Sequence, residues 1–136
     1  MPTPNQLLHE TRWQPHWLML LLVFAAISAY FAFSPGPPAL PSSSLDKLNH
    51  LAAFAAMGLA AALAQPAGLR ASFTAAAGLL IYGGFIEVVQ SLLPTHYADL
   101  ADLGADALGI TLGLLLVATL RRVWGPSVRP LADTVF

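Results

Sequence analysis

The sequence predicts an all-α membrane protein, a four-helix transmembrane bundle with both termini cytoplasmic. Hydrophobic residues make up 57% of the 136 residues and charged residues only 10%, whereas a soluble domain carries about a quarter charged residues. Four long apolar segments follow one another, and most basic residues flank them on one side. We therefore expect residues 1–136 to form a single integral membrane domain, multi-pass in the inner (cytoplasmic) membrane of a cell.

Prolines mark the breaks between the apolar segments. Pro15 suits the first turn of a helix, because its missing N–H needs no partner there. Pro66 and Pro94 mark the two short connections further along the chain. The predicted transmembrane segments are about 15–33, 46–65, 70–93 and 99–120. Each is close to the roughly 20 residues that cross a bilayer, and connections this short imply antiparallel neighbours.

The basic residues determine the expected orientation. Lys47 is the basic residue on one side of the predicted bundle. The five on the other side are Arg12, Arg70, Arg121, Arg122 and Arg129. The positive-inside rule places the arginine-rich side, and with it both termini, in the cytoplasm. The first segment is expected to be an anchor, because its apolar stretch is long and no clear A-x-A cleavage pattern follows it.

Composition also excludes several classes of function. The chain has no cysteine, so thiol catalysis, disulfides and thiolate metal sites are excluded. The net charge of −1 argues against a nucleic-acid partner, because phosphate binding needs clustered Lys and Arg. The lipid bilayer is the partner that the composition indicates.

Polar side chains gather at three segment ends that the predicted topology places on the outer side. The second and fourth segments begin on this side, and the third ends there. An ionisable side chain within a membrane helix costs free energy and is rarely kept without a function. The candidate polar site comprises Asp46, Lys47, His50, Glu87, Gln90, Asp102 and Asp106.

Helical spacing places several of these residues on shared faces. Asp46 and His50 are four residues apart and therefore lie on one face. One stripe of the last segment runs through Asp99, Asp102, Asp106, Gly109 and Gly113. Glycines at such spacing permit close helix contact, so this stripe is expected to face another helix. The glycines assigned to helix packing are Gly83, Gly109 and Gly113. Small-residue faces of this kind would also allow a homo-oligomer.

Structural explanations compete with a functional site at each position. Asp46 and Asp102 can each cap the helix that they begin, and Asp99 is expected to be interfacial and solvated. His50 alone would be a hydrogen-bonded core histidine, and Gln90 can join two helices through a hydrogen bond. The arginines after the last segment are read as topology anchors without chemistry of their own.

The order and spacing of these motifs are similar to a known family. The chain carries Asp46-Lys47-Leu48-Asn49-His50, then Glu87-Val88-Val89-Gln90, then Asp102 to Asp106 and Gly109. This series resembles the VanZ-like family, named for a membrane protein associated with teicoplanin resistance, and the match covers about residues 46–113. The resemblance implies a small polytopic membrane protein with a role in the cell envelope.

Two positions depart from the family pattern. His96 stands where an arginine usually follows the proline-containing turn, and Asp106 stands where asparagine is usual. Arginine can grip a phosphate with two hydrogen bonds, whereas histidine carries a positive charge only when protonated. Both departures make the expected site more negative and weaken the case for anion binding.

Electrostatics limits the chemistry of the expected site. Three carboxyl groups in proximity, those of Glu87, Asp102 and Asp106, cannot all be ionised without compensation. Proton uptake, pairing with Lys47 and His50, or a bound cation would each compensate. No cofactor is predicted, because the chain lacks H-E-x-x-H or comparable metal spacing. A divalent metal such as Mg, Mn or Zn remains an alternative, because oxygen ligands with one imidazole suit such ions.

Two functions follow from these residues and the resemblance. The first is a binding or accessory role in the cell envelope, related to glycopeptide resistance, with a lipid-linked or cell-wall component as partner. The alternative is an intramembrane enzyme acting on a lipid-linked envelope substrate, with Asp46 and His50 as a base and Glu87 nearby. A small transporter fits less well, because the polar groups lie on one side while a transport path needs both.

Overall fold

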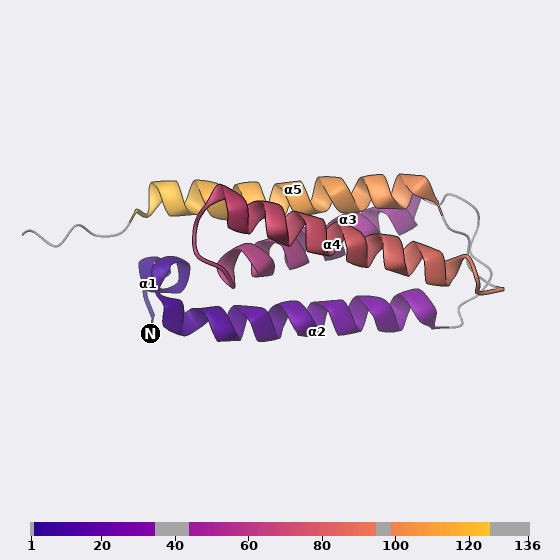
Figure 1. Cartoon of the computed structure of the whole chain (residues 1–136), viewed down its shortest axis with the longest axis horizontal. Helices are drawn as coiled ribbons and strands as arrows, with labels where there is room; N and C mark the ends of the chain where they lie inside the picture. The colour runs from indigo at the N-terminus through magenta and orange to yellow at the C-terminus, as the bar shows by residue number, and fades with distance from the viewer. Residues whose placement is uncertain (1, 35–43, 95–98, 126–136) are drawn as a thin grey trace, which may run out of the picture.

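The structure of this chain, a computed structural model, describes residues 2–34, 44–94 and 99–125. All regular structure in these ranges is helical: α1 (Pro4–His9), the 3-10 turn η1 (Thr11–Trp13), α2 (Gln14–Phe33), α3 (Ser44–Leu63), α4 (Leu69–Gln90) and α5 (Leu100–Val123). The long helices α2 to α5 lie side by side and successive ones run in opposite directions (Figure 1). Their ends differ from the predicted segment bounds by at most three residues.

Three helical stretches of the described chain are long and apolar enough to cross a membrane. They are Thr11–Phe33, Leu69–Gln90 and Leu100–Val123. Large apolar side chains cover their outer faces: Phe31 is 71% exposed and Ile81 is 74% exposed. Contiguous apolar surface of this kind is unfavourable in water and favourable in lipid. The fold is therefore that of an all-α protein suited to a membrane.

Helix α3 is not among these three stretches, although the sequence predicts a transmembrane segment there. Its first turns carry Asp46, Lys47 and His50, and its second half is mainly alanine. It packs against α2, α4 and α5, and its buried residues reach from Phe54 to Leu63. A helix surrounded by other helices contacts less lipid, so it needs less apolar surface than its neighbours.

Local sequence signals explain where several helices begin. Thr3 and Gln6 form a capping box at the start of α1, a short helix that the apolar pattern does not predict. Pro15 lies in the first turn of α2, as expected. Gly68 precedes α4 with φ +153°, a conformation that side chains rarely adopt. Asp99 caps α5 by accepting a hydrogen bond from the backbone N–H of Ala101 at 2.9 Å.

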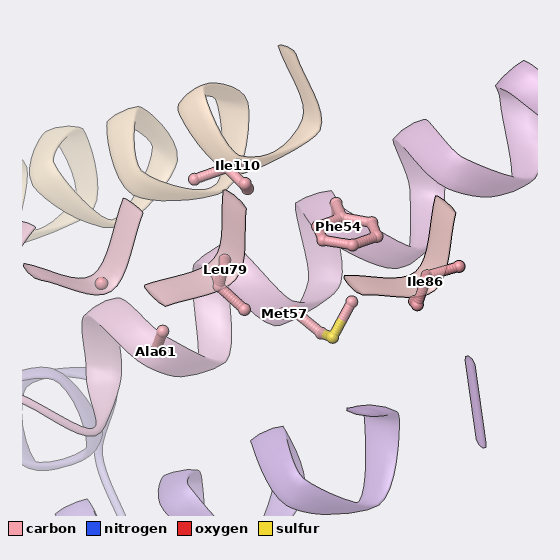
Figure 2. Close-up of a cluster of buried hydrophobic side chains, with 7 residues drawn as sticks. Phe54, Met57, Ala61, Leu79, Ile86 and Ile110 are labelled. Atoms are coloured by element: carbon pink, nitrogen blue, oxygen red, sulfur yellow. The ribbon is translucent and has the colours of Figure 1, made fainter. Parts of the chain in front are cut away.

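The apolar core lies between α3, α4 and α5. Figure 2 shows its labelled side chains: Phe54, Met57, Ala61, Leu79, Ile86 and Ile110. Phe54 and Met57 are at most 1% exposed. In a membrane the stabilisation from this core comes mainly from close packing, because lipid is also apolar.

Glycines allow α3 and α5 to approach each other closely. A Cβ atom built at Gly109 would collide with the carbonyl oxygen of Leu51, and one at Gly113 with the carbonyl oxygen of Ala55. On α3, a Cβ atom at Gly58 would lie 2.9 Å from the carbonyl oxygen of Ile110. Gly109 and Gly113 thus lie at a close helix contact. Gly58, which the sequence reading omits, completes it from the other helix.

Half-buried polar groups form hydrogen bonds at the end of the molecule where α1 lies. Arg121 donates from Nε to the carbonyl oxygen of Leu8 at 3.1 Å and from an Nη to that of Gln65 at 3.0 Å. Trp17 donates to the carbonyl oxygen of Leu7 at 3.2 Å. Arg121 therefore joins α1, α5 and the end of α3, a structural role that the topology-anchor reading misses.

Candidate functional site

Three of the long helices bring polar residues to the same end of the molecule. Helices α3 and α5 begin there and α4 ends there, opposite the end where α1 lies (Figure 1). The first turn of α3 contains Asp46, and the first turn of α5 contains Asp102. Glu87 and Gln90 lie in the last turn of α4. The antiparallel order of the helices is sufficient to gather these residues.

Lys47 pairs with two carboxylates across the contact between α3 and α5. Its Nζ lies 2.8 Å from Oδ2 of Asp99 and 3.7 Å from Oδ1 of Asp102. The Lys47 and Asp99 side chains are each 29% exposed, whereas that of Asp102 is 4% exposed. Lys47 is therefore the cation at the rim of the cluster, and Asp102 is its buried acid.

His50 lies one turn further into the molecule and faces two other acids. Its Nδ1 donates to Oδ1 of Asp106 at 2.9 Å. Its Nε2 is 4.0 Å from Oε1 of Glu87, too far for a hydrogen bond. The side chain of Asp106 is fully buried, and those of His50 and Glu87 are 11% exposed. The imidazole is thus fixed by one carboxylate and approached by another.

Glu87 also joins the end of α4 to the start of α5. Its Oε2 accepts a hydrogen bond from the backbone N–H of Asp99 at 2.9 Å. Asp99 is therefore the N-cap of α5 and a partner of Lys47, which corrects the expectation that it is merely solvated at the interface. Asp102 is not the cap of that helix, because it lies within the first turn. Asp46 likewise lies inside α3, which begins at Ser44.

Gly83 makes room for the most deeply buried acid. A Cβ atom at Gly83 would collide with Oδ2 of Asp106 and would lie 3.2 Å from the ring of Phe54. Phe54 in turn stacks against the imidazole of His50, with ring centroids 6.3 Å apart and planes 5° apart. Gly83 therefore has a more specific role than general helix packing, since it accommodates the Asp106 carboxylate.

The site has more acid than the described side chains compensate. Its carboxyl groups belong to Asp46, Glu87, Asp99, Asp102 and Asp106, and its described basic groups are one ammonium and one imidazole. Three carboxyl oxygens are buried and accept no hydrogen bond within the described chain: Glu87 Oε1, Asp102 Oδ1 and Asp106 Oδ2. Unsatisfied buried polar atoms are costly and uncommon. Proton uptake or a partner outside the described side chains would compensate these carboxyl oxygens.

One subset of the site has the composition of a metal-binding group. Asp46, His50 and Asp102 each offer one ligand atom, and these three atoms lie within 4.8 Å of one another. They come from α3 and α5, which the glycine contact holds together. Two carboxylates and an imidazole are ligands that divalent transition metals accept.

Two polar residues that the sequence analysis names do not contribute to this metal-binding group. One contacts a different helix, and the other lies outside the described residues. Gln90 donates through Nε2 to the carbonyl oxygen of Ala32 at 3.4 Å and therefore joins α4 to α2. This contact matches the interpretation that Gln90 joins two helices. His96, which departs from the family pattern, lies outside the described residues.

A second polar contact joins α4 to α2 and was not predicted from the sequence. The hydroxyl of Tyr82 donates to the carbonyl oxygen of Ala25 at 2.6 Å and lies 3.0 Å from the hydroxyl of Ser28. Tyr82 also approaches Phe54, with ring centroids 6.1 Å apart. The only sequence signal was a tyrosine in the middle of an apolar segment, where its hydroxyl needs a buried partner.

Comparisons with known proteins add no family to this description. No family model matches the chain, and no curated protein or solved structure does either. The resemblance to the VanZ-like family stays a prediction that rests on the motifs themselves.

Proposed function

We propose that this chain is a multi-pass protein of the cytoplasmic membrane whose polar site binds a component of the cell envelope. The observation that carries the proposal is the convergence of Lys47, His50, Glu87, Asp102 and Asp106 at one end of helices with apolar outer surfaces. Buried ionisable groups in a membrane protein mark functional sites by default.

The outer side of the membrane is the proposed location of the site. Arg12 precedes α2, Arg70 lies in the first turn of α4 and Arg122 lies in the last turn of α5. These helix ends lie opposite the polar end (Figure 1), and basic residues prefer the cytoplasmic side. In the proposed topology α3 crosses the membrane as a fourth helix, sheltered by α2, α4 and α5. Both termini are then cytoplasmic.

The charge of the site suggests the chemistry of its ligand. Excess carboxylate favours a partner that supplies positive charge or hydrogen-bond donors. A lipid-linked or cell-wall component with amine, amide or hydroxyl groups fits this requirement at the outer leaflet. With the VanZ-like motifs, this chemistry supports an accessory envelope role of the kind tied to glycopeptide resistance.

Cysteine labelling tests the topology, because the natural chain contains no cysteine. Ser44→Cys introduces an exposed thiol at the polar end, and Ala67→Cys introduces one in the connection at the other end. A membrane-impermeant maleimide added to intact cells is expected to label only Ser44→Cys. Labelling of both variants, or of Ala67→Cys alone, contradicts the proposed orientation.

Envelope phenotypes test the function. Glu87→Ala and Asp102→Ala are each expected to abolish a glycopeptide-susceptibility phenotype of the wild-type chain while membrane insertion is retained. Glu10→Gln is the matched control, because Glu10 is an acid at the opposite end, paired with Arg12 at the surface. An unchanged phenotype in both site variants contradicts the proposal.

A second candidate function is an intramembrane enzyme acting on a lipid-linked substrate. The observation that favours it is the hydrogen bond of 2.9 Å from His50 to Asp106. A carboxylate that orients one imidazole nitrogen leaves the other free to act as a general base. Conversion of a lipid-linked substrate that disappears in His50→Ala would support catalysis. Purified protein that is inert toward a broad panel of envelope lipids would favour binding alone.

A further inference from the structure

We propose that Asp46, His50 and Asp102 bind one divalent transition-metal ion. The inference deepens the proposed function, since the ion would occupy the same polar site. The ligand atoms of the three residues lie within 4.8 Å of one another. Ligands about 2.0–2.2 Å from a shared tetrahedral zinc ion are separated by about 3.4 Å. The three groups therefore need to close by up to about 1.4 Å.

One oxygen of the buried acid in this group lacks a hydrogen-bond donor among the described residues. The side chain of Asp102 is 4% exposed, and its Oδ1 accepts no hydrogen bond from the described residues. The ammonium of Lys47 is 3.7 Å from that oxygen and bonds instead to Asp99 at 2.8 Å. A carboxylate removed from water needs a cation or donors in direct contact. A metal ion between the three ligands supplies that contact.

His50 already has the partner that metal-bound histidines usually have. Such a histidine commonly binds the metal through one ring nitrogen and donates from the other to a carboxylate. Asp106 accepts this hydrogen bond from Nδ1 at 2.9 Å, which makes Nε2 the nitrogen that remains for a metal. Asp106 is thus a positioning residue in this proposal, and its own position depends on the space left by Gly83.

The ligand set indicates the class of ion. Calcium and magnesium prefer oxygen ligands alone, whereas imidazole with carboxylates suits zinc, manganese and iron. Three protein ligands leave at least one coordination position for water or a ligand group. The ion would also balance part of the excess negative charge of the cluster.

Metal binding can be measured on the purified full-length chain in detergent. After chelation, MnCl₂ and ZnCl₂ are titrated by isothermal calorimetry, and bound metal is counted by mass spectrometry after desalting. The expected result is one bound ion per chain, with magnesium binding at least about 100-fold more weakly than the better of the two metals.

Four variants separate the ligands from their surroundings. His50→Ala and Asp102→Asn are each expected to weaken binding by more than about 100-fold, because each removes a ligand. Asp106→Asn is expected to weaken it by about 10- to 100-fold, as is typical when a metal ligand loses its supporting partner. Glu10→Gln is the control: Glu10 lies at the opposite end, paired with Arg12 at the surface, and affinity should stay within about threefold.

Two results would overturn the proposal. One is a folded wild-type chain that binds neither metal at millimolar concentration, which would assign the role of the cation to Lys47 alone. The other is binding that is equal in the wild type, His50→Ala and Asp102→Asn, which would assign the ion to another place. Circular dichroism of each variant excludes loss of folding as the cause. The phenotype of Glu87→Ala is independent of these results, so failure of the metal site and failure of the envelope function can be distinguished.

Discussion

The two ends of this molecule both withdraw charged side chains from the surface, but only the polar end buries them fully. At the end where α1 lies, Arg121 donates to two backbone carbonyl oxygens, those of Leu8 and Gln65. At the other end, Glu87, Asp102 and Asp106 each retain a buried oxygen that accepts no hydrogen bond in the described chain. A charge with hydrogen-bond partners is sufficiently explained by structure, whereas an unsatisfied one requires another explanation.

This difference indicates which of the charged side chains to regard as functional. Arg121 supports the fold, because its donors satisfy carbonyl groups at the ends of two helices. The acids at the polar end hold part of the fold as well, since Glu87 binds the backbone of Asp99. They differ from Arg121 because each still has a carboxyl oxygen that can bind a cation or accept a hydrogen bond. Variants at each end can therefore test this distinction.

The largest effect is expected at the glycine contact that holds α3 against α5. Gly109→Ala places a methyl group against the backbone of Leu51 and Ala55, and such overpacking costs typically about 1–3 kcal/mol. Thermal unfolding in detergent should show a clear fall in the midpoint. Gly104→Ala is the control, because a Cβ atom there meets nothing within 4 Å and alanine favours the helix by about 1 kcal/mol. Equal midpoints for the two variants would contradict the close contact.

The next effect is expected at Arg121, and on stability alone. Arg121→Met leaves the partly buried carbonyl groups of Leu8 and Gln65 without this donor, at a cost of about 1.5 kcal/mol, the lower end for hydrogen bonds to a charged group. Metal affinity and envelope phenotype should persist wherever the variant folds. Arg122→Met is more exposed and should stay within about 0.5 kcal/mol. Loss of metal affinity in folded Arg121→Met would break the proposed division between the two ends.

The opposite pattern is expected for Asp106. Asp106→Asn keeps the shape of the side chain and removes the charge of a carboxylate whose Oδ2 accepts no hydrogen bond from the residues that the structure describes. The unfolding midpoint is expected to stay the same or to rise by the equivalent of up to about 1 kcal/mol, as when a functional site is relieved of strain. The envelope phenotype is expected to be lost. A large fall in the midpoint together with a normal phenotype would make Asp106 a structural residue like Arg121.

The smallest effect is expected at Gln90. Its hydrogen bond to Ala32 is long, at 3.4 Å, and joins α4 to α2 rather than to the acids. Gln90→Leu should change stability by about 0.5–1 kcal/mol, the usual net contribution of one hydrogen bond. The envelope phenotype and metal affinity should not change. A lost phenotype would return Gln90 to the polar site in which the sequence analysis includes it.

Much of the helical arrangement can be read from the sequence, since apolar runs of sufficient length and prolines between them indicate helices and breaks. The lengths of α2, α4 and α5 follow this pattern closely. The pattern does not predict helix α1, because a helix of six residues is too short to show an apolar period. Its capping box of Thr3 and Gln6 was the available signal.

The candidate site divides in the same way. That Asp46, Glu87 and Asp102 lie at one end follows from antiparallel order alone. The sequence does not say which acid meets His50, because Asp46 shares its helix face while Asp106 lies on a different helix. The structure pairs His50 with Asp106 at 2.9 Å, and the space for that carboxylate comes from Gly83 on a third helix.

From the sequence it follows that the surroundings of the protein are apolar and where the long helices lie along the chain. It also follows at which end of the molecule the charged groups gather. These properties depend on composition and on periodicity along one chain. The tertiary structure was needed to show that α3 packs against three other helices and that Gln90 binds α2. It was also needed to show that three carboxyl oxygens accept no hydrogen bond within the described chain. The reason is geometric: helical period defines the faces of each helix, but the rotation and closeness of neighbouring helices decide which faces meet.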